Sequence, residues 1–354
     1  MPALLPEFRA RVPGAVALRR LPNATCEDIR ASGLARIFQP MRYGGSEAPL
    51  EAMIDILIPV GSACSANAWC LAQFLIHNYM IARWPTAAQD AIWGDQPDAL
   101  VSGILIPLLG KAKRVDGGAR LTGRWPFVSG IVGADWCILS GMMENATDAA
   151  TIESYFLVPT SQVSIFDNWY SIGLQGTGSN DVEVTDSFIP AHMIITAKGF
   201  VRRRFCRSVR QSRSVIPSAR LHDLRHSVDI DRDRPNAMVA EYLAQSRKAF
   251  TVMSGQEIRS FQTQQIKLGE ATAALNAAQA LIRADAREIQ TLATTYQSPD
   301  SVKRSKYRSN AAHASALAYW AAQRIFDLAG ARAIYTNNEI GVEFFSTSSS
   351  RRAT

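Results

Sequence analysis

The order of hydrophobic patterns along the chain predicts helices near both ends and strands between them. From about residue 99 to residue 196, short runs of β-branched and aromatic residues alternate with turn residues, which is typical of a β-sandwich or β-barrel. Over residues 262–293 and 305–330, alanine and larger apolar residues recur three and four positions apart, as in the helices of an antiparallel bundle. Nearer the start we expect helices over residues 25–33 and 86–93, and two apolar helices within residues 46–84 that are interrupted near Gly61.

A β-hairpin is predicted within residues 114–130, which read RVDGGARLTGRWPFVSG. The turn is Asp116-Gly117-Gly118, because two-residue hairpin loops of this kind need φ angles above zero. The apolar face of the strand that follows is expected to consist of Leu121, Gly123, Trp125 and Phe127. The strand ends at Ser129, where a hydroxyl and backbone N–H groups beside aromatic rings suit the edge of a planar heterocycle. The alternative is a core strand that ends in a turn.

Composition limits the class of protein. The 354 residues exceed one ordinary core and predict two or three domains. With 47% hydrophobic and 19% charged residues, no run of eighteen apolar residues and no leader-like start, the chain is expected to be a cytoplasmic globular protein without a membrane segment. Five scattered cysteines favour buried thiols over disulfides or a zinc site. They are Cys26, Cys64, Cys70, Cys137 and Cys206.

Much of the net charge of +7 lies in one block, residues 201–235, which holds ten arginines and no lysine. It has no helical or strand periodicity, and three interpretations are open. One is an arginine-rich arm that folds on RNA, another is a solvated linker, and the third, which we favour, is a reading-frame disturbance that ends near Met238. The uneven distribution of charge argues against nucleic-acid binding by the whole chain.

Several motifs together resemble the acyl-CoA dehydrogenase fold, and in particular its flavin-dependent aromatic hydroxylases. These are QPMRYGG at residues 39–45, a Gly-Ser pair ahead of Trp69, the strand ending WPFVSG, and GLQGTGSNDVEVTDSFIP at residues 173–190. The resemblance implies an α+β protein with an N-terminal helical domain (1–97), a middle β-barrel domain (98–198), the arginine-rich segment (199–237) and a C-terminal helical bundle (238–354). It also implies that the bundle is incomplete. The family has an Arg-Asp-x-His pattern after the turn at Gly330, and this chain has GVEFFSTSSSRRAT in its place. The interpretation we favour is a second frame disturbance after residue 341.

The resemblance further implies the oxygenase component of a two-component monooxygenase, which hydroxylates a phenol- or indole-type substrate through a flavin C4a-hydroperoxide. The cofactor is then reduced FMN or FAD and O2 is the co-substrate. No Gly-x-Gly-x-x-Gly follows a strand, so a separate NAD(P)H:flavin reductase is expected to deliver the flavin. A homotetramer is implied for an intact bundle, and pigment formed by later autoxidation is one expected product.

Site residues follow from the same resemblance. His77 and Ser102 match catalytic positions, and His77 lies eight residues after Trp69, two turns along the same helix face. Flavin contacts are expected from Trp69, Phe127, Ser129, Gly176, Ser179 and, for a phosphate, Arg308. Read without the family, His77 is a core histidine, Arg308 a surface charge and GTGS at residues 176–179 a β-turn. Two other functions stay open: a damaged or non-catalytic flavin-fold protein, and an acyl-CoA dehydrogenase with Glu339 or Glu343 in the region of its base.

Overall fold

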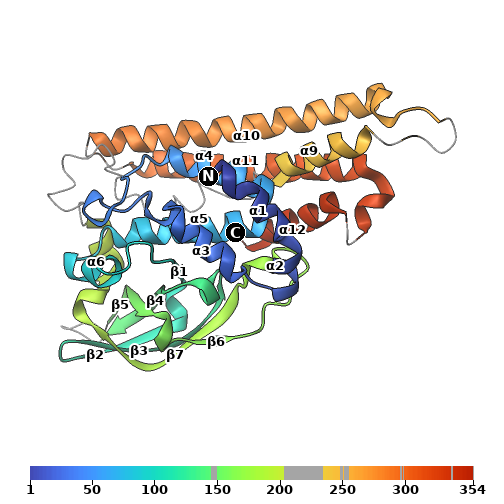
Figure 1. The fold of residues 1–354 in the computed structure, drawn as a ribbon. Coiled ribbons are helices and arrows are strands. Elements are labelled where there is room, and N and C mark those ends of the chain that lie inside the picture. The colour runs from blue at the N-terminus through green and yellow to red at the C-terminus, as the bar shows by residue number, and fades with distance from the viewer. Residues whose placement is uncertain are drawn as a thin grey trace.

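The computed structural model describes residues 1–144, 150–202, 234–247, 250, 255–295, 297, 299–335 and 338–353. Figure 1 shows a β-sheet on one side, long helices on the other and α5 between them. The α+β architecture with helical ends and a central sheet is therefore as predicted from the sequence. Most of the arginine-rich block, residues 203–233, lies outside the described residues.

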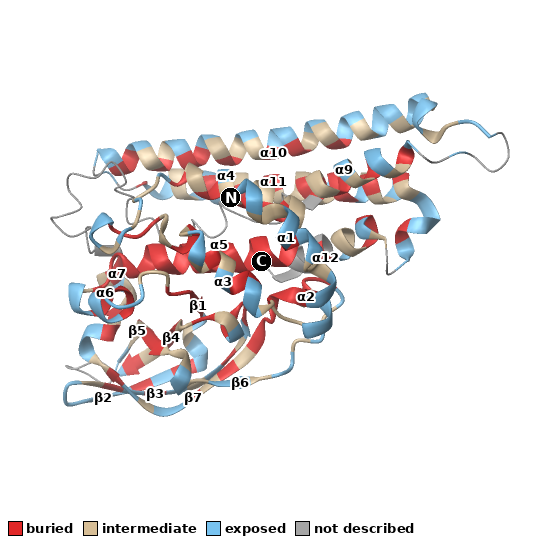
Figure 2. Ribbon diagram, in the orientation of Figure 1, coloured by how far each residue is buried: buried red, intermediate tan, exposed pale blue. Residues whose placement is uncertain are grey.

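The N-terminal third consists of helices that pack around a buried one. They are α1 (Leu5–Ala10), α2 (Val12–Leu18), α3 (Asn23–Ala31), α4 (Glu51–Ala63), α5 (Ser65–Ile81) and α6 (Thr86–Trp93). All residues of α5 are buried, as expected for a helix that is apolar on every side, and Figure 2 shows it as a continuous red segment between sheet and bundle. The predicted break between the two apolar helices falls at Cys64, where the backbone is extended, three residues after Gly61.

Within the described residues, eight strands form one mixed sheet. They are β1 (Val101–Ile104), β2 (Gly110–Val115), β3 (Gly118–Val128), β4 (Trp136–Glu144), β5 (Thr151–Pro159), β6 (Ser164–Phe166), β7 (Asn180–Pro190) and β8 (Ile194–Thr196). The order is β6-β7-β3-β2-β4-β5-β8, with β1 paired to β4. The predicted hairpin is confirmed, since Val115 pairs with Gly118 across Gly117, whose φ is +74°.

The predicted apolar face of β3 is wrong at its last member. Leu121 and Trp125 are fully buried, but Phe127 is 60% exposed and has a φ of +63°. A register shift between Trp125 and Val128 in the pairing with β7 adds a residue to one strand, which reverses the side that later residues face. Val128 is therefore buried instead. A second shift in the same pairing lies between Leu121 and Gly123. Strict alternation along β7 from the buried Val184 would bury Phe188 as well, but beyond this shift Phe188 is 42% exposed.

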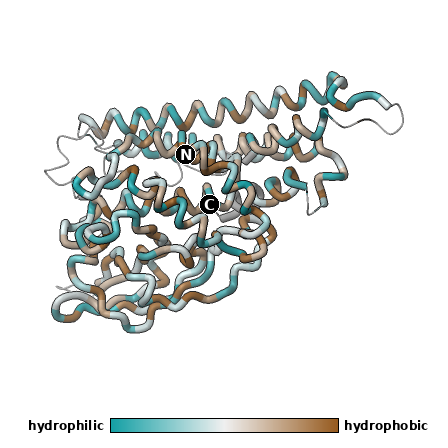
Figure 3. Tube along the Cα trace, viewed as in Figure 1, coloured by the Kyte–Doolittle hydropathy of each residue, from teal (hydrophilic) through white to brown (hydrophobic). Residues whose placement is uncertain are grey.

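The C-terminal part is helical. It includes α7 (Ala197–Arg202), α9 (Arg234–Ser246), α10 (Gln262–Thr294), α11 (Ser301–Ala329) and α12 (Glu339–Ala353). Along α10, hydrophobic and hydrophilic residues alternate as on a helix with one buried face (Figure 3). Buried alanines of α10 and α11, such as Ala278 and Ala314, allow the two long helices to approach closely. Met238, where the sequence pattern resumes, is buried in α9.

A partly buried carboxylate ties the first helices to the sheet, and its removal should destabilise the protein. Asp135 Oδ2 accepts hydrogen bonds from Leu100 N and from Arg30 Nη2, each at 2.8 Å. We expect Asp135→Ala to lower the free energy of unfolding by about 1–3 kcal/mol, because a backbone N–H and a guanidinium lose their acceptor. Urea unfolding measures this. Glu257→Ala, which removes an exposed ion pair with Arg259, serves as the control and should cost less than about 1 kcal/mol.

Candidate functional site

Three hydroxyl groups and one indole form a buried chain of hydrogen bonds where α5, β3 and the loop before β7 meet. Trp69 Nε1 donates to Ser129 Oγ at 2.9 Å. Ser129 Oγ lies 2.8 Å from Ser179 Oγ, which lies 2.7 Å from Thr177 Oγ1. Thr177 Oγ1 donates to the carbonyl of Leu174 at 2.9 Å. Each of these side chains is buried, so the structure brings together Trp69, Ser129 and Ser179 of the predicted set.

The turn at residues 129–130 is held against the loop by its backbone. Gly130 N donates to the carbonyl of Thr177 at 2.8 Å. Gly130 has a φ of +73°, and a Cβ at this position would lie 2.7 Å from Phe74 Cζ. Only glycine meets both conditions without strain, and the turn consequently aims the Ser129 hydroxyl at Trp69 and Ser179.

His77 and Ser102 both make hydrogen bonds that involve β1. Ser102 Oγ donates to the backbone carbonyl of Ser129 at 2.6 Å. His77 Nδ1 lies 3.1 Å from the carbonyl of Val101. A carbonyl only accepts, so Nδ1 carries the proton, and a neutral ring then has its lone pair on Nε2. That nitrogen lies 3.1 Å from the point that a Cβ on Gly103 would occupy, and the backbone oxygen of Ile138 lies 2.6 Å from the same point, so a side chain there would clash first with β4.

The remaining predicted residues are placed differently. Phe127 is exposed at the end of β3, and its ring meets that of Trp169 edge-on at 6.3 Å between centroids. Gly176 is buried, and a Cβ there would lie 3.0 Å from Ala15 Cβ and 3.1 Å from Ala66 Cβ, so it serves close packing. Arg308 lies on an exposed face of α11, whereas the hydroxyl chain is built from α5, the end of β3 and the loop before β7.

Thr177 is a member of the cluster that sequence reasoning missed. It stands between two glycines of the GTGS turn, and the only signal for it is a hydroxyl residue two positions before Ser179. The C-terminal helix also reaches this region. Ser65 at the start of α5 donates to Glu343 Oε1 at 3.4 Å, and Leu174 N donates to Ser346 Oγ at 3.3 Å. The helix α12 therefore packs beside the loop whose Leu174 carbonyl ends the hydroxyl chain.

The thiol nearest the cluster is neutral. Cys70 Sγ lies 3.5 Å from the carbonyl of Thr177, and burial raises the pKa of the Cys70 thiol well above its usual value. A buried thiol of this kind is not a nucleophile at neutral pH. Further along α5, burial likewise raises the pKa of the Tyr79 hydroxyl to about 12. The cluster thus offers neutral hydrogen-bonding groups.

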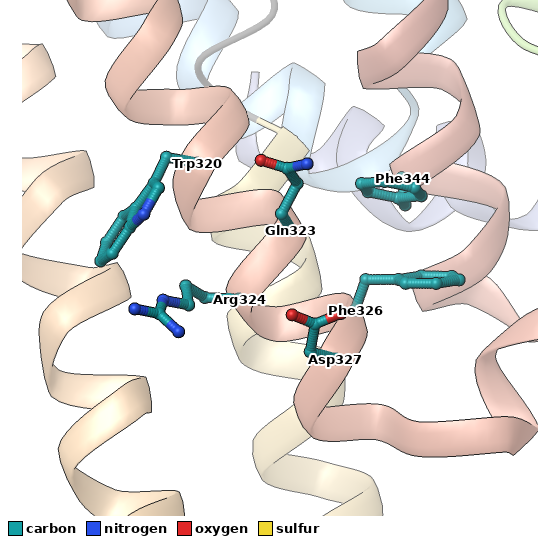
Figure 4. A pocket seen from close by; sticks show the side chains of 6 residues that line it. All are labelled: Trp320, Gln323, Arg324, Phe326, Asp327 and Phe344. Atoms are coloured by element: carbon teal, nitrogen blue, oxygen red, sulfur yellow. The ribbon is translucent and has the colours of Figure 1, made fainter.

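A separate pocket of about 360 Å³ lies on the bundle, between α11 and α12. Figure 4 shows its lining: Trp320, Gln323, Arg324, Phe326, Asp327 and Phe344. The rings of Phe326 and Phe344 stack at 4.3 Å, and Arg324 lies over Trp320. None of the eight site residues predicted from the sequence lines this pocket, so it does not enlarge the hydroxyl cluster.

Two other features are absent from the part of the chain that the structure describes. There, no group of three or more His, Cys, Asp or Glu side chains is arranged to hold a metal ion. No helix within the described ranges has the length and apolar character needed to cross a bilayer.

Comparisons with known proteins agree with one another. A family model described as "Acyl-CoA dehydrogenase, C-terminal domain" matches residues 236–341. The flavin-dependent monooxygenase oxygenase subunit HsaA of Rhodococcus jostii is 26% identical over 94% of this chain and 87% of its own length. The p-hydroxyphenylacetate 3-hydroxylase oxygenase component of Acinetobacter baumannii is 26% identical over 95% of this chain and 80% of its own. XiaF from a Streptomyces species, solved with FADH2 and glycerol, superposes with a TM-score of 0.90 at 24% identity, over 99% of this chain and 88% of that one.

Proposed function

We propose that this chain, which belongs to the flavin-dependent monooxygenases with the acyl-CoA dehydrogenase fold, hydroxylates a phenol- or indole-type aromatic compound as the oxygenase component of a two-component system. Relatives named for p-hydroxyphenylacetate and indole-3-acetate support this substrate class. The observation that carries the proposal is the buried Trp69–Ser129–Ser179 chain, with Ser102 of β1 bonded to the Ser129 carbonyl and His77 bonded to the carbonyl of Val101 at the start of β1. Reduced flavin is the cofactor, and a separate reductase supplies it.

The residues at the end of β3 fit a flavin ring. Phe127 presents an exposed aromatic side chain two residues before Ser129, with Trp169 against its edge. A planar ring stacked there gains the contacts that aromatic pairs favour. Ser129 Oγ accepts one hydrogen bond from Trp69 and has a second lone pair for a group on the edge of that ring. Thus Phe127 and Ser129 would hold the ring, with Trp69 fixing the hydroxyl.

When bound, the reduced flavin supplies two electrons and two protons, so that one atom of O2 enters the aromatic ring as a hydroxyl group and the other leaves as water. The protein's own part is to activate the substrate and to exclude water. His77 Nε2 accepts a hydrogen bond from the substrate's phenol O–H or indole N–H, which raises electron density in the ring. Ser102, bonded to the Ser129 carbonyl, fixes the strand end against which the substrate lies. Burial of Trp69, His77, Ser102 and Ser129 keeps water out.

The proposal is tested by anaerobic titration of the purified chain with photoreduced FMN or FAD, followed by mixing with O2 and a panel of phenols and indoles. We expect saturable binding of the reduced flavin and a hydroxylated product that contains one atom from ¹⁸O₂. Co-purification of oxidised FAD together with oxidation of acyl-CoA thioesters would contradict the proposal in favour of a dehydrogenase. Absence of any flavin binding would contradict it in favour of a non-catalytic protein.

Assembly and location are finer parts of the proposal. We propose a homotetramer formed through the bundle, because α10 and α11 expose the apolar side chains of Ile266, Val302 and Trp320. Light scattering should then give four times the mass of one chain, and a monomer would contradict this part. We also propose a cytoplasmic location. Four cysteines of the described residues are buried thiols outside disulfide bonds, in keeping with a reducing compartment: Cys26, Cys64, Cys70 and Cys137.

A further inference from the structure

The buried chain of hydroxyl groups has a direction, and its two ends set that direction. At one end the indole N–H of Trp69 only donates; at the other the carbonyl of Leu174 only accepts. Between them stand three hydroxyl groups, each with one proton to give. The chain contains four hydrogen bonds and four protons.

Only one arrangement of protons satisfies all four bonds. Thr177 must donate to the Leu174 carbonyl, which leaves it nothing to donate to Ser179. Ser179 therefore donates to Thr177, across 2.7 Å, and cannot also donate to Ser129. Ser129 in turn donates to Ser179, across 2.8 Å, and accepts from Trp69. The proton of Ser129 is thus fully used inside the protein, and what it has left is a lone pair.

This fixed order matters for any ligand that reaches Ser129. A ligand atom with an N–H finds an acceptor and adds a fifth hydrogen bond to the chain. A ligand atom with a lone pair faces another lone pair, unless Ser129 turns away from Ser179 and leaves a buried hydroxyl without its donor. Such a loss in the interior costs about 1–3 kcal/mol, which corresponds to roughly 5- to 150-fold in affinity.

We propose that Thr177 and Ser179 are positioning residues that keep Ser129 an acceptor, and that the site thereby distinguishes the reduced flavin from the oxidised one. The proposal rests on the proposed function. Reduced flavin carries N–H at N5, whereas the oxidised ring has a lone pair there. The reduced form therefore offers a hydrogen-bond donor to Ser129 Oγ, and the oxidised form offers an acceptor. Neither Thr177 nor Ser179 needs to touch the ring for this effect, because each acts through the proton of Ser129.

The test compares dissociation constants for reduced and oxidised FMN, and for reduced and oxidised FAD, by anaerobic titration of the full-length chain. Thr177→Val removes the hydroxyl at nearly constant volume and lets Ser179 turn its proton toward Ser129. Ser179→Ala frees the proton of Ser129 directly. Thr177→Ser retains the hydroxyl and is the conservative control, while Thr185→Val changes a hydroxyl on the exposed side of β7.

In the unmodified chain we expect reduced flavin to bind about tenfold more tightly than oxidised flavin, or better. Thr177→Val and Ser179→Ala should bring the two constants close together, mainly through tighter binding of the oxidised form. Thr177→Ser and Thr185→Val should keep the original ratio. A role in folding alone would weaken both forms alike and leave the ratio unchanged.

Two results separate this inference from the function beneath it. If the unmodified chain binds both redox forms equally, or if both variants keep its ratio, the positioning role is overturned while flavin binding stands. If the unmodified chain binds neither form, the proposed function itself is wrong and the hydroxyl chain is only structural.

Discussion

Replacement of His77 by asparagine should reduce aromatic hydroxylation about 10²–10⁴-fold, the usual contribution of a positioned general base or acceptor. Asparagine can still donate an N–H to the carbonyl of Val101, the bond that His77 Nδ1 makes at 3.1 Å. It offers no basic nitrogen in place of Nε2. We therefore expect reduced flavin to bind normally and to be oxidised by O2, with hydrogen peroxide formed in place of the hydroxylated product.

Product chromatography and a peroxide assay, run on the same samples, measure the two outcomes. His192→Asn is the matched control, because His192 is exposed in the turn before β8 and has no part in the proposed site. Its product yield should equal that of the unmodified chain. If His77→Asn gives as much product as His192→Asn, His77 is an ordinary core histidine.

Replacement of Trp125 by alanine should have the largest effect on stability, a loss of about 3–5 kcal/mol in the free energy of unfolding. The ring is fully buried in β3, and its Nε1 donates to the carbonyl of Ser140 at 2.8 Å. It fills the space above two glycines, since a Cβ at Gly110 or Gly123 would lie 2.5 or 2.8 Å from its atoms. Alanine leaves a cavity there and a carbonyl without its donor.

Trp125→Phe provides the graded control. It keeps an aromatic ring but loses the N–H and part of the indole's volume, so we expect a smaller cost than for alanine, about 1–3 kcal/mol in urea unfolding. Because Phe127 and Ser129 follow on the same strand, the alanine variant should also lose affinity for reduced flavin. A midpoint for Trp125→Ala equal to that of the unmodified chain would show that the sheet does not depend on this ring.

Local sequence signals were sufficient to predict the long helices and the β-hairpin. The long helices over residues 262–294 and 301–329 have a sustained helical period, and the hairpin at Gly117 has the glycine that its positive φ requires. The side of the sheet on which Phe127 lies did not follow from local pattern, because an extra residue in the pairing with β7 reverses it. Alternation along one strand contains no information about a shift in its neighbour.

The candidate site was predictable to a similar degree. Trp69, Ser129 and Ser179 were found through a family resemblance, and the structure joins them by hydrogen bonds. Thr177 was missed, because its hydroxyl acquires a role only when the loop folds back on the Leu174 carbonyl. Arg308 stays a prediction. In the tetramer proposed above, its surroundings would depend on neighbouring subunits, which a single-chain sequence pattern does not specify.

A crystal structure of the chain with reduced flavin tests the central claim most directly. We expect the edge of the flavin ring within hydrogen-bonding distance of Ser129 Oγ, about 3 Å, with the ring stacked near Phe127 and the space beside His77 open to an aromatic substrate. Density for the ring in the pocket between Trp320 and Phe344, with the Trp69–Ser129–Ser179–Thr177 chain remote from it, would contradict this assignment.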